Sequence, residues 1–390
     1  MSGRDASHCR RPLALALALA LVVLLAACGG SDAPEPAAED AAREDPATTP
    51  SSAAEPATPP CAPAPLEVRA ATVLVVGLGT ATTAEHPLSA QVASLGLGGV
   101  VLVKPNVVDA TQVRTLVDGL RRQSPRPLLV SVDEEGGRVS RLRPIIGTTP
   151  SARELGRRPP AEISAVAAER GATLRDLGFD LVLAPVVDVD GGPAVGAIGD
   201  RSFATTPAEA GARAAAFAEG LSRAGVLPTA KHFPGQGEVA DSHDGAVVAD
   251  VTLGELEATA AATFGPVIEG GVPAVMMSHV TFPALGTLPT SLEPAAYRLL
   301  RSLGFEGVAV TDAVNMSAVA DQRSLTEATV MALAAGADLV LATPGDQAAA
   351  MRDAVVAAVA DGRLPEARLD EAVARVLALR GEEPSTMVCG

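Results

Sequence analysis

The stretch Val73-Leu74-Val75-Val76-Gly77-Leu78-Gly79 decides the class of fold, because it joins an apolar run to a tight turn. A short run of Val and Leu bounded by glycine predicts a strand that is buried on both faces, as in a parallel sheet. In an open, doubly wound sheet such a strand would lead into a dinucleotide-binding turn. The third glycine of a G-x-G-x-x-G turn is missing, so the open sheet is the second choice.

Outward from this strand, short β-branched runs alternate with longer Ala-rich amphipathic segments. The predicted strands are Val73–Val76, Val100–Val103, Leu128–Val132, Leu181–Pro185, Thr229–His232, Ala274–His279, Val308–Thr311 and Leu339–Ala342. The predicted helices are 110–123, 161–177, 207–224, 253–269, 293–303, 325–335, 347–361 and 368–379. Eight such units close a (β/α)8 TIM barrel, and we expect residues 66–390 to form this single catalytic domain.

The first residues of the chain predict an export signal. Arg4, Arg10 and Arg11 precede an apolar run from Leu13 to Ala27, which ends in front of Cys28. The run is short for a spanning helix, and the small residues before Cys28 suit cleavage that leaves a lipid-bearing cysteine. We therefore expect residues 1–28 to be a lipoprotein signal peptide with Cys28 as the lipidation site. The alternative is an uncleaved anchor.

Residues 29–65 predict a disordered tether, because they consist of Pro, Ala, Ser, Thr and acidic residues without Val, Ile, Leu, Phe or Tyr. Seven acidic residues and Arg43 give this segment a net charge of −6, out of −16 for the chain. The acidity of the remainder argues against nucleic acid as a partner, because phosphate binding needs basic patches. We expect a monomer anchored to the outer face of a bacterial cell membrane.

The four cysteines are assigned by position. Cys9 lies in the signal segment and Cys28 at its end, whereas Cys61 and Cys389 flank the folded part. Outside the cytoplasm such a pair can oxidise, so a Cys61–Cys389 disulfide and two free thiols are both open. No Cys or His cluster in the sequence has metal-ligand spacing, and we expect no metal site.

Active sites in such barrels lie at the carboxyl ends of the strands, and polar residues end or follow five of the predicted strands. These are the segment from Asp133 to Arg141, then Asp188, the pair Lys231-His232, the pair Ser278-His279, and Asp312. Any one of them could cap a helix or form a salt bridge. Together at one end of the barrel they favour chemistry on a sugar.

A retaining glycosidase needs a carboxylate nucleophile and a separate acid/base. Asp312 follows an apolar strand and fits the first role. His243, oriented by Asp241 on a Gly-rich loop, fits the second role, because an imidazole exchanges protons near neutral pH. The alternative for Asp241-Ser242-His243 is a solvated turn.

Sugar hydroxyls also need fixed polar partners. Asp133 can accept hydrogen bonds from a diol, and the donors are Arg141, Arg201, Lys231 and His232. The chain has no Trp and a single tyrosine, Tyr297 in a predicted outer helix. Stacking on the sugar is therefore left to Phe and Met.

Six motifs in order resemble glycoside hydrolase family 3, and most closely its single-domain bacterial β-N-acetylglucosaminidases. They are Asp133–Leu142, Ala184–Val189, Ile198–Phe203, Lys231–His243, Met277–Val280, and Leu303–Val308 leading to Thr311-Asp312. The resemblance implies that Asp312 is the nucleophile and that His243 with Asp241 is the acid/base. It also implies that Asp133, Arg141, Arg201, Lys231 and His232 grip N-acetylglucosamine, without a cofactor.

The resemblance leaves several activities open. The first is release of terminal N-acetylglucosamine from peptidoglycan fragments through a glycosyl-aspartate. β-Glucosidase, β-xylosidase and phosphorylase activities of the same family are alternatives, as is an inactive glycan-binding surface lipoprotein. The chain departs from the family pattern at Gln236, where a histidine is usual, and in a slightly shorter loop before Asp241.

Overall fold

The computed structural model describes residues 62–194, 196–236 and 241–389, which form a barrel of eight parallel strands. The barrel strands are β1 (Leu74–Gly77), β2 (Gly99–Leu102), β3 (Leu129–Val132), β6 (Leu181–Val182), β7 (Leu227–Phe233), β8 (Ala274–Met277), β9 (Val308–Thr311) and β10 (Val340–Ala342). Neighbours pair in the order β10-β1-β2-β3-β6-β7-β8-β9. A parallel bridge between Val310 and Leu339 joins the two ends of this order and closes the barrel. The predicted (β/α)8 TIM barrel is confirmed.

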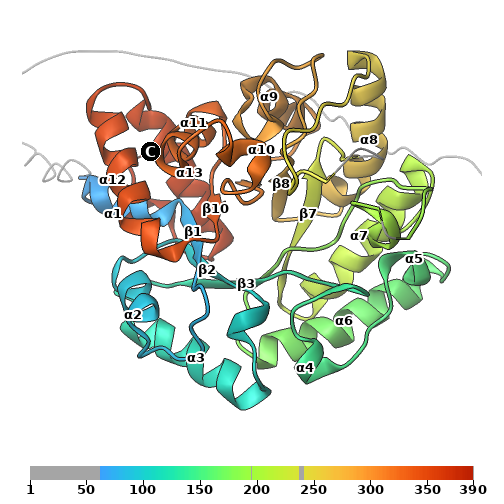
Figure 1. Cartoon of the computed structure of the whole chain (residues 1–390), viewed down its shortest axis with the longest axis horizontal. Coiled ribbons are helices and arrows are strands. Elements are labelled where there is room, and N and C mark those ends of the chain that lie inside the picture. The colour runs from blue at the N-terminus through green and yellow to red at the C-terminus, as the bar shows by residue number, and fades with distance from the viewer. Residues whose placement is uncertain (1–61, 195, 237–240, 390) are drawn as a thin grey trace, which may run out of the picture. The chain divides into compact units, whose positions relative to one another are not determined.

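The eight predicted helices surround the strands (Figure 1). They are α3 (Ala110–Gln123), α6 (Pro160–Asp176), α7 (Pro207–Arg223), α8 (Leu253–Glu269), α9 (Pro294–Ser302), α11 (Leu325–Ala335), α12 (Ala348–Ala360) and α13 (Glu366–Leu379). Two further helices of seven or more residues were not predicted, α1 (Leu66–Thr72) and α2 (Pro87–Ser94). Both are short, and seven or eight residues carry too little periodic pattern to identify a helix.

The core has two layers, because alternate residues of each strand point into the barrel and out of it. In β9, Val308 and Val310 pack inside the barrel, whereas Ala309 packs outside under the helices. The inner layer also contains Met276 of β8. The filled interior makes the barrel a packed core rather than a pore, and only its ends are open to ligands.

A small hairpin follows β3 at the carboxyl end of the barrel. Its strands are β4 (Glu134–Gly136) and β5 (Val139–Ser140), and the short helices α4 (Arg143–Ile146) and α5 (Ala152–Leu155) come next. Gly136 has a φ of 96°, and a Cβ there would lie 2.5 Å from the carbonyl oxygen of Pro150. Glycine is therefore required for the chain to turn at this point.

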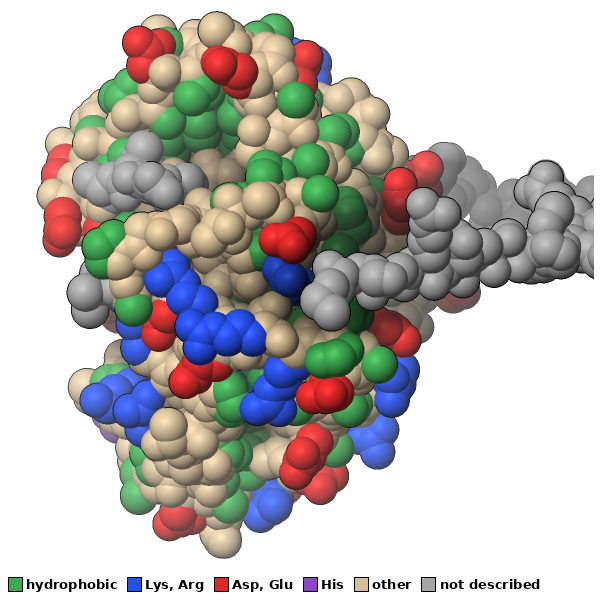
Figure 2. All heavy atoms as spheres, turned by 90° about the vertical axis from the view of Figure 1, so that its right-hand side faces the viewer, with side chains coloured by type: hydrophobic (Ala, Val, Ile, Leu, Met, Phe, Trp, Pro, Cys, Tyr) green, Lys and Arg blue, Asp and Glu red, His purple; other side chains and the backbone are tan. Residues whose placement is uncertain are grey.

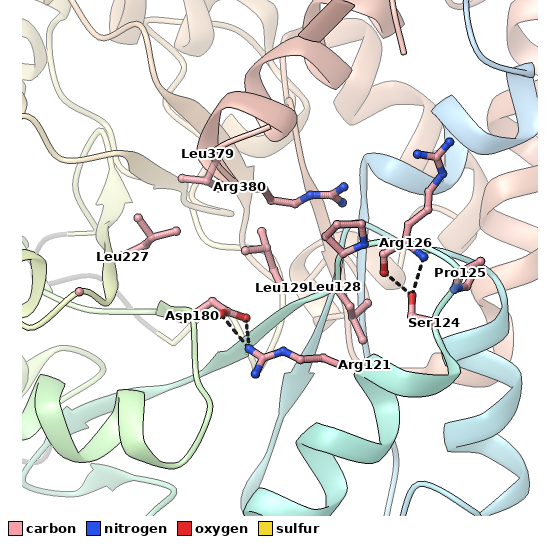
Figure 3. Close-up of a pocket in the computed structure, with 13 residues that line it drawn as sticks. Arg121, Ser124, Pro125, Arg126, Leu128, Leu129, Asp180, Leu227, Leu379 and Arg380 are labelled. Carbon is pink, nitrogen blue, oxygen red and sulfur yellow. Dashed lines mark hydrogen bonds and ion pairs between the residues drawn. The ribbon is translucent and has the colours of Figure 1, made fainter. Parts of the chain in front are cut away.

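At the opposite, amino end of the strands lies an open cavity of about 710 Å³ (Figure 3). Leu128 and Leu227 lie at its edge, and Arg121 forms an ion pair with Asp180 at 2.8 Å. Asp180 also accepts a hydrogen bond from the backbone N–H of Val130 at 2.8 Å. These polar groups stabilise the ends of strands, which is the usual role of residues at this end of a barrel.

The predicted signal peptide and residues 29–61 of the predicted tether, including Cys28 and Cys61, lie outside the described residues, whereas residues 62–65 are described. Cys389 is disulfide-bonded. The N–H of Ala64 donates to the carbonyl of Met387 at 2.9 Å, so the first described residues lie beside the carboxyl terminus. This contact is compatible with Cys61 as the partner, and the pairing stays a prediction. None of the described helices is long and apolar enough to cross a membrane.

Candidate active site

A buried lysine forms the floor at the carboxyl end of the barrel. The Lys231 Nζ atom lies 2.6 Å from Asp133 Oδ1 and 2.6 Å from Glu135 Oε1, and its side chain is 3% exposed. Burial alone would lower the pKa of Lys231, but the two carboxylates outweigh it and raise the pKa above its usual value. The ammonium group is therefore a permanent positive charge in the floor.

Two arginines complete this ionic network. Arg141 Nη2 lies 2.9 Å from Asp133 Oδ2. Arg201 binds Glu135 through both arms of its guanidinium, at 2.8 and 2.9 Å. Burial would raise the pKa of Glu135, but Arg201 and Lys231 hold it far below its usual range. Each carboxylate is thus fixed by two cations, and these ion pairs hold the floor in one geometry.

His232 lies beside Lys231 and also faces the cavity, although consecutive residues of a regular strand point to opposite sides. The register between β7 and β8 shifts between Lys231 and Phe233, and the Lys231–His232 peptide bond is cis. The Nδ1 atom of His232 lies 2.7 Å from Asp188 Oδ2. Its Nε2 atom lies 3.5 Å from Arg201 Nη2.

Asp188 holds more than the imidazole. Its carboxylate accepts the backbone N–H of His232 at 3.1 Å and that of Gln236 at 2.5 Å. It therefore connects the floor with the start of the loop that leads to Asp241 and His243. Residues 237–240 of that loop lie outside the described part of the chain.

Asp312 follows the last residue of β9. Its backbone N–H donates to the carbonyl of Met277 at 3.0 Å, and its Oδ1 accepts the N–H of Ala313 at 2.7 Å. Burial would raise the pKa of Asp312, but His232, His279 and the hydrogen bond from the Ala313 N–H lower it more, so that the pKa lies below its usual value. Asp312 is therefore ionised at neutral pH, as a nucleophile must be.

His243 and Asp241 lie at the rim of the cavity. His243 Nδ1 is 2.7 Å from Asp241 Oδ1, and the His243 side chain is 68% exposed. The carbonyl of Ser242 accepts the N–H of Ala318 at 3.3 Å, which ties this part of the loop to α10 (Ser317–Ala320). The solvated-turn alternative is right about exposure, but the imidazole still faces the cavity.

All eight residues predicted for catalysis and sugar binding line one cavity of about 260 Å³. They are Asp133, Arg141, Arg201, Lys231, His232, Asp241, His243 and Asp312. Met276 and Met316 supply apolar surface, and no aromatic side chain is among the described residues that line the cavity. Tyr297 is buried in α9, where its hydroxyl donates to the carbonyl of Ser291.

Arg201 was predicted to donate hydrogen bonds to the sugar, but its guanidinium donates mainly to Glu135. Glu135 and Asp188 are the site residues that received no role beforehand. Each had a signal, because Glu135 lies in the motif after β3 and Asp188 follows β6. The described residues contain no group of three or more His, Cys, Asp or Glu that could hold a metal ion.

A buried ionised aspartate, a histidine at the rim and a polar floor fit a barrel enzyme that acts on glycosidic bonds. Residues 66–379 match the glycosyl hydrolase family 3 N terminal domain. The chain belongs to glycoside hydrolase family 3 and is a glycoside hydrolase.

The relatives carry related names. The chain is 38% identical over 334 residues to beta-hexosaminidase LpqI of Mycobacterium tuberculosis, covering 82% of this chain and 83% of that protein. A solved family 3 glycosyl hydrolase from Mycobacterium smegmatis has a TM-score of 0.75 and 39% identity, covering 81% of this chain and 97% of that chain. A beta-N-acetylhexosaminidase from Beutenbergia cavernae has a TM-score of 0.74 and 32% identity, covering 81% and 98% of the two chains.

Proposed function

We propose that the protein is a retaining exo-β-N-acetylglucosaminidase that removes terminal N-acetylglucosamine from peptidoglycan fragments. The observation that carries the proposal is the Asp241–His243 pair at the rim of the cavity that contains Asp312. The beta-hexosaminidase names of the relatives support the same sugar. The cavity of about 260 Å³ suits one sugar ring, since pockets for larger ligands start at about 300 Å³.

In the first step, a carboxylate oxygen of Asp312 attacks the anomeric carbon, and the bond from that carbon to the leaving oxygen breaks. His243 donates the proton that the leaving oxygen needs. Asp241 fixes the imidazole through Nδ1, so that Nε2 is the atom available to the substrate. The products of this step are the free leaving alcohol and a glycosyl-aspartate ester.

In the second step, His243 accepts a proton from water while the water oxygen attacks the anomeric carbon. The ester bond to Asp312 breaks, which regenerates the carboxylate and restores the original configuration. The floor of Asp133, Lys231 and His232 holds the sugar hydroxyls in both steps. Because the floor is fixed by ion pairs, little reorganisation is needed during the reaction.

We further propose that the protein is exported and held at the outer face of the cell membrane through lipid on Cys28. The support is the sequence of residues 1–28 and the low-complexity segment that follows them. Palmitate labelling of the intact protein and of Cys28→Ala in cells tests this proposal, because the variant should lose both the label and the membrane association.

Release of a chromogenic alcohol from β-N-acetylglucosaminide and from β-glucoside tests the activity. We expect preference for the N-acetylglucosaminide, and strong loss in Asp312→Ala and His243→Ala. Preference for the glucoside would favour the β-glucosidase alternative, and no turnover of either substrate would favour a binding protein. Parallel assays in phosphate identify a phosphorylase by formation of the sugar phosphate.

A further inference from the structure

A second cavity, of about 410 Å³, lies next to the sugar cavity and is unusually basic. Four arginines line it, namely Arg138, Arg143, Arg153 and Arg157, against the two acidic residues Glu154 and Asp200. The chain as a whole carries a net charge of −16, so the positive charge of this cluster is opposite in sign to the net charge of the chain. Basic side chains gather near the centre of the face that lies on the right of Figure 1, where α5 lies (Figure 2).

The two acidic residues of the cavity already have partners. Asp200 accepts a hydrogen bond from Arg138 Nε at 2.8 Å. The Glu154 carboxylate accepts the N–H of Ser151 at 2.8 Å and its hydroxyl at 3.2 Å, and these bonds keep the pKa of Glu154 below its usual value. The charge of Glu154 also acts on Arg157, but four arginines against two carboxylates leave the cavity with an excess of positive charge.

Two of those arginines have guanidinium N–H donors without an acceptor among the described residues. Arg143 donates to one backbone carbonyl, that of Gly137, at 2.5 Å. The Arg157 guanidinium forms no hydrogen bond or ion pair with any residue that the structure describes, and its side chain is exposed. Guanidinium groups with free donors in a concave site bind carboxylates well, because the fork matches both oxygens.

Arg138 connects this cavity with the sugar cavity, since it lines both. Its Nη2 atom donates to the carbonyls of Gly196 at 2.6 Å and Ile198 at 2.9 Å. These bonds hold the side chain in place as a shared wall. A substituent that extends past Arg138 from a sugar in the first cavity would reach the basic cavity.

We propose that the basic cavity is a subsite for a carboxylate on the leaving-group side of the substrate. This inference rests on the proposed function and names the class of leaving group, a sugar with an acidic substituent. In peptidoglycan fragments that group is N-acetylmuramic acid, whose lactyl ether carries a carboxylate. Arg143 and Arg157 bind the carboxylate, while Arg138 marks the border with the sugar cavity.

The test compares disaccharides that differ in this group alone. The acidic substrate is N-acetylglucosaminyl-β-1,4-N-acetylmuramic acid, and the neutral one is N,N′-diacetylchitobiose. The amide of the lactyl group is a third substrate, which keeps the bulk and removes the charge. The variant is Arg143→Gln with Arg157→Gln, and the matched control is Arg158→Gln, an exposed arginine that does not line the cavity.

We expect the double variant to lose roughly tenfold in kcat/KM on the acidic disaccharide, since each exposed charge pair contributes about twofold to fivefold. Turnover of the neutral and amide substrates should stay within about twofold of the unsubstituted protein. The control should resemble the unsubstituted protein on all three substrates. Replacement of both arginines by lysine should restore part of the preference.

Equal losses on the acidic and neutral substrates would overturn the proposal, as would an unchanged ratio between them. Calorimetric binding to Asp312→Asn separates this result from failure of the proposed function. In that variant the acidic disaccharide should bind more tightly than chitobiose, and the difference should fall when Arg143 and Arg157 are replaced. If neither disaccharide is hydrolysed but the difference in binding is present, the subsite is supported and the proposed activity is wrong. Equal binding of the two disaccharides would refute the subsite.

Discussion

His243 Nδ1 lies 2.7 Å from Asp241 Oδ1, and the same oxygen accepts the backbone N–H of His243 at 3.0 Å. Burial would raise the pKa of Asp241, but these two bonds keep it below its usual value. The carboxylate is therefore ionised at neutral pH and holds a proton on Nδ1. The arrangement leaves Nε2 as the atom that exchanges protons with a substrate.

The first prediction concerns Asp241. In Asp241→Asn the amide oxygen can still accept both hydrogen bonds, but it no longer fixes the tautomer by charge. We expect kcat to fall by roughly 10²-fold, within the range of general acid/base effects, with little change in KM. The measurement is steady-state hydrolysis of β-N-acetylglucosaminides with good and poor leaving groups.

The matched control for Asp241 is Asp244→Asn, an exposed acid on the same loop that does not line the cavity. Its kinetic constants should stay close to those of the unsubstituted protein. A larger loss for poor leaving groups than for good ones in Asp241→Asn identifies loss of proton donation. Equal losses for both would contradict the acid role of the pair.

The second prediction is a pH profile set by Asp312. Because the pKa of this carboxyl is below its usual value, the nucleophile stays ionised through the range in which an ordinary aspartate is protonated. With a dinitrophenyl leaving group, which needs no proton, kcat/KM should stay flat from neutral pH down to about pH 4. A decline centred at about pH 4 or higher in this assay would show that the pKa of Asp312 is not held below that of an ordinary aspartate.

The third prediction concerns Asp188, a positioning residue that acts through His232. In Asp188→Asn the Nδ1–H of His232 loses a charged acceptor, and a bond of this kind contributes about 1.5–3 kcal/mol. We expect kcat/KM to fall roughly 10- to 100-fold, mainly through weaker substrate binding and a higher KM.

A double-mutant cycle with His232→Gln checks the assignment of Asp188. If Asp188 acts through His232, the combined variant should be little worse than His232→Gln alone. Thermal unfolding of each variant measures any general loss of stability. Additive effects on kcat/KM would place the role of Asp188 elsewhere, for example in holding the N–H of Gln236.

The barrel was predictable because its signals are local and repeat eight times along the chain. Buried strands are short apolar runs, and the helices between them carry amphipathic patterns of ten or more residues. The hairpin after β3 was missed, because its strands have three and two residues and its turn looks like any Gly-rich loop.

The site was predictable as a set of residues, since parallel strands bring their carboxyl ends together. The hydrogen-bond and ion-pair partners of each residue were not predictable. Arg201 and Glu135 are 66 positions apart, and Asp188 and His232 are 44 apart. Such pairings depend on the tilt of the strands and on packing, which a single sequence does not display.

The last prediction concerns Glu134, which lies next to the site but faces the protein interior. Its Oε2 accepts the N–H of Leu142 and the hydroxyl of Ser140, both at 3.0 Å, and its Oε1 is buried without a partner among the described residues. Burial raises the pKa of Glu134 above its usual value. Because the folded protein prefers the protonated form, this side chain stabilises the fold below about pH 4.5, and that stabilisation is lost as the pH rises through the folded pKa.

Glu134→Gln removes this titration while keeping an oxygen acceptor for the N–H of Leu142. The free energy of unfolding of the unsubstituted protein should therefore fall relative to that of the variant above about pH 4.5, by at most about 1.4 kcal/mol per pH unit. Urea denaturation of both proteins at pH 4.5, 5.5, 6.5 and 7.5, values chosen to span the range above the usual glutamate pKa of about 4.3, measures the difference. Parallel curves for the two proteins would mean that Glu134 titrates as an ordinary carboxyl, and a relative gain for the unsubstituted protein at higher pH would reverse the sign argued here.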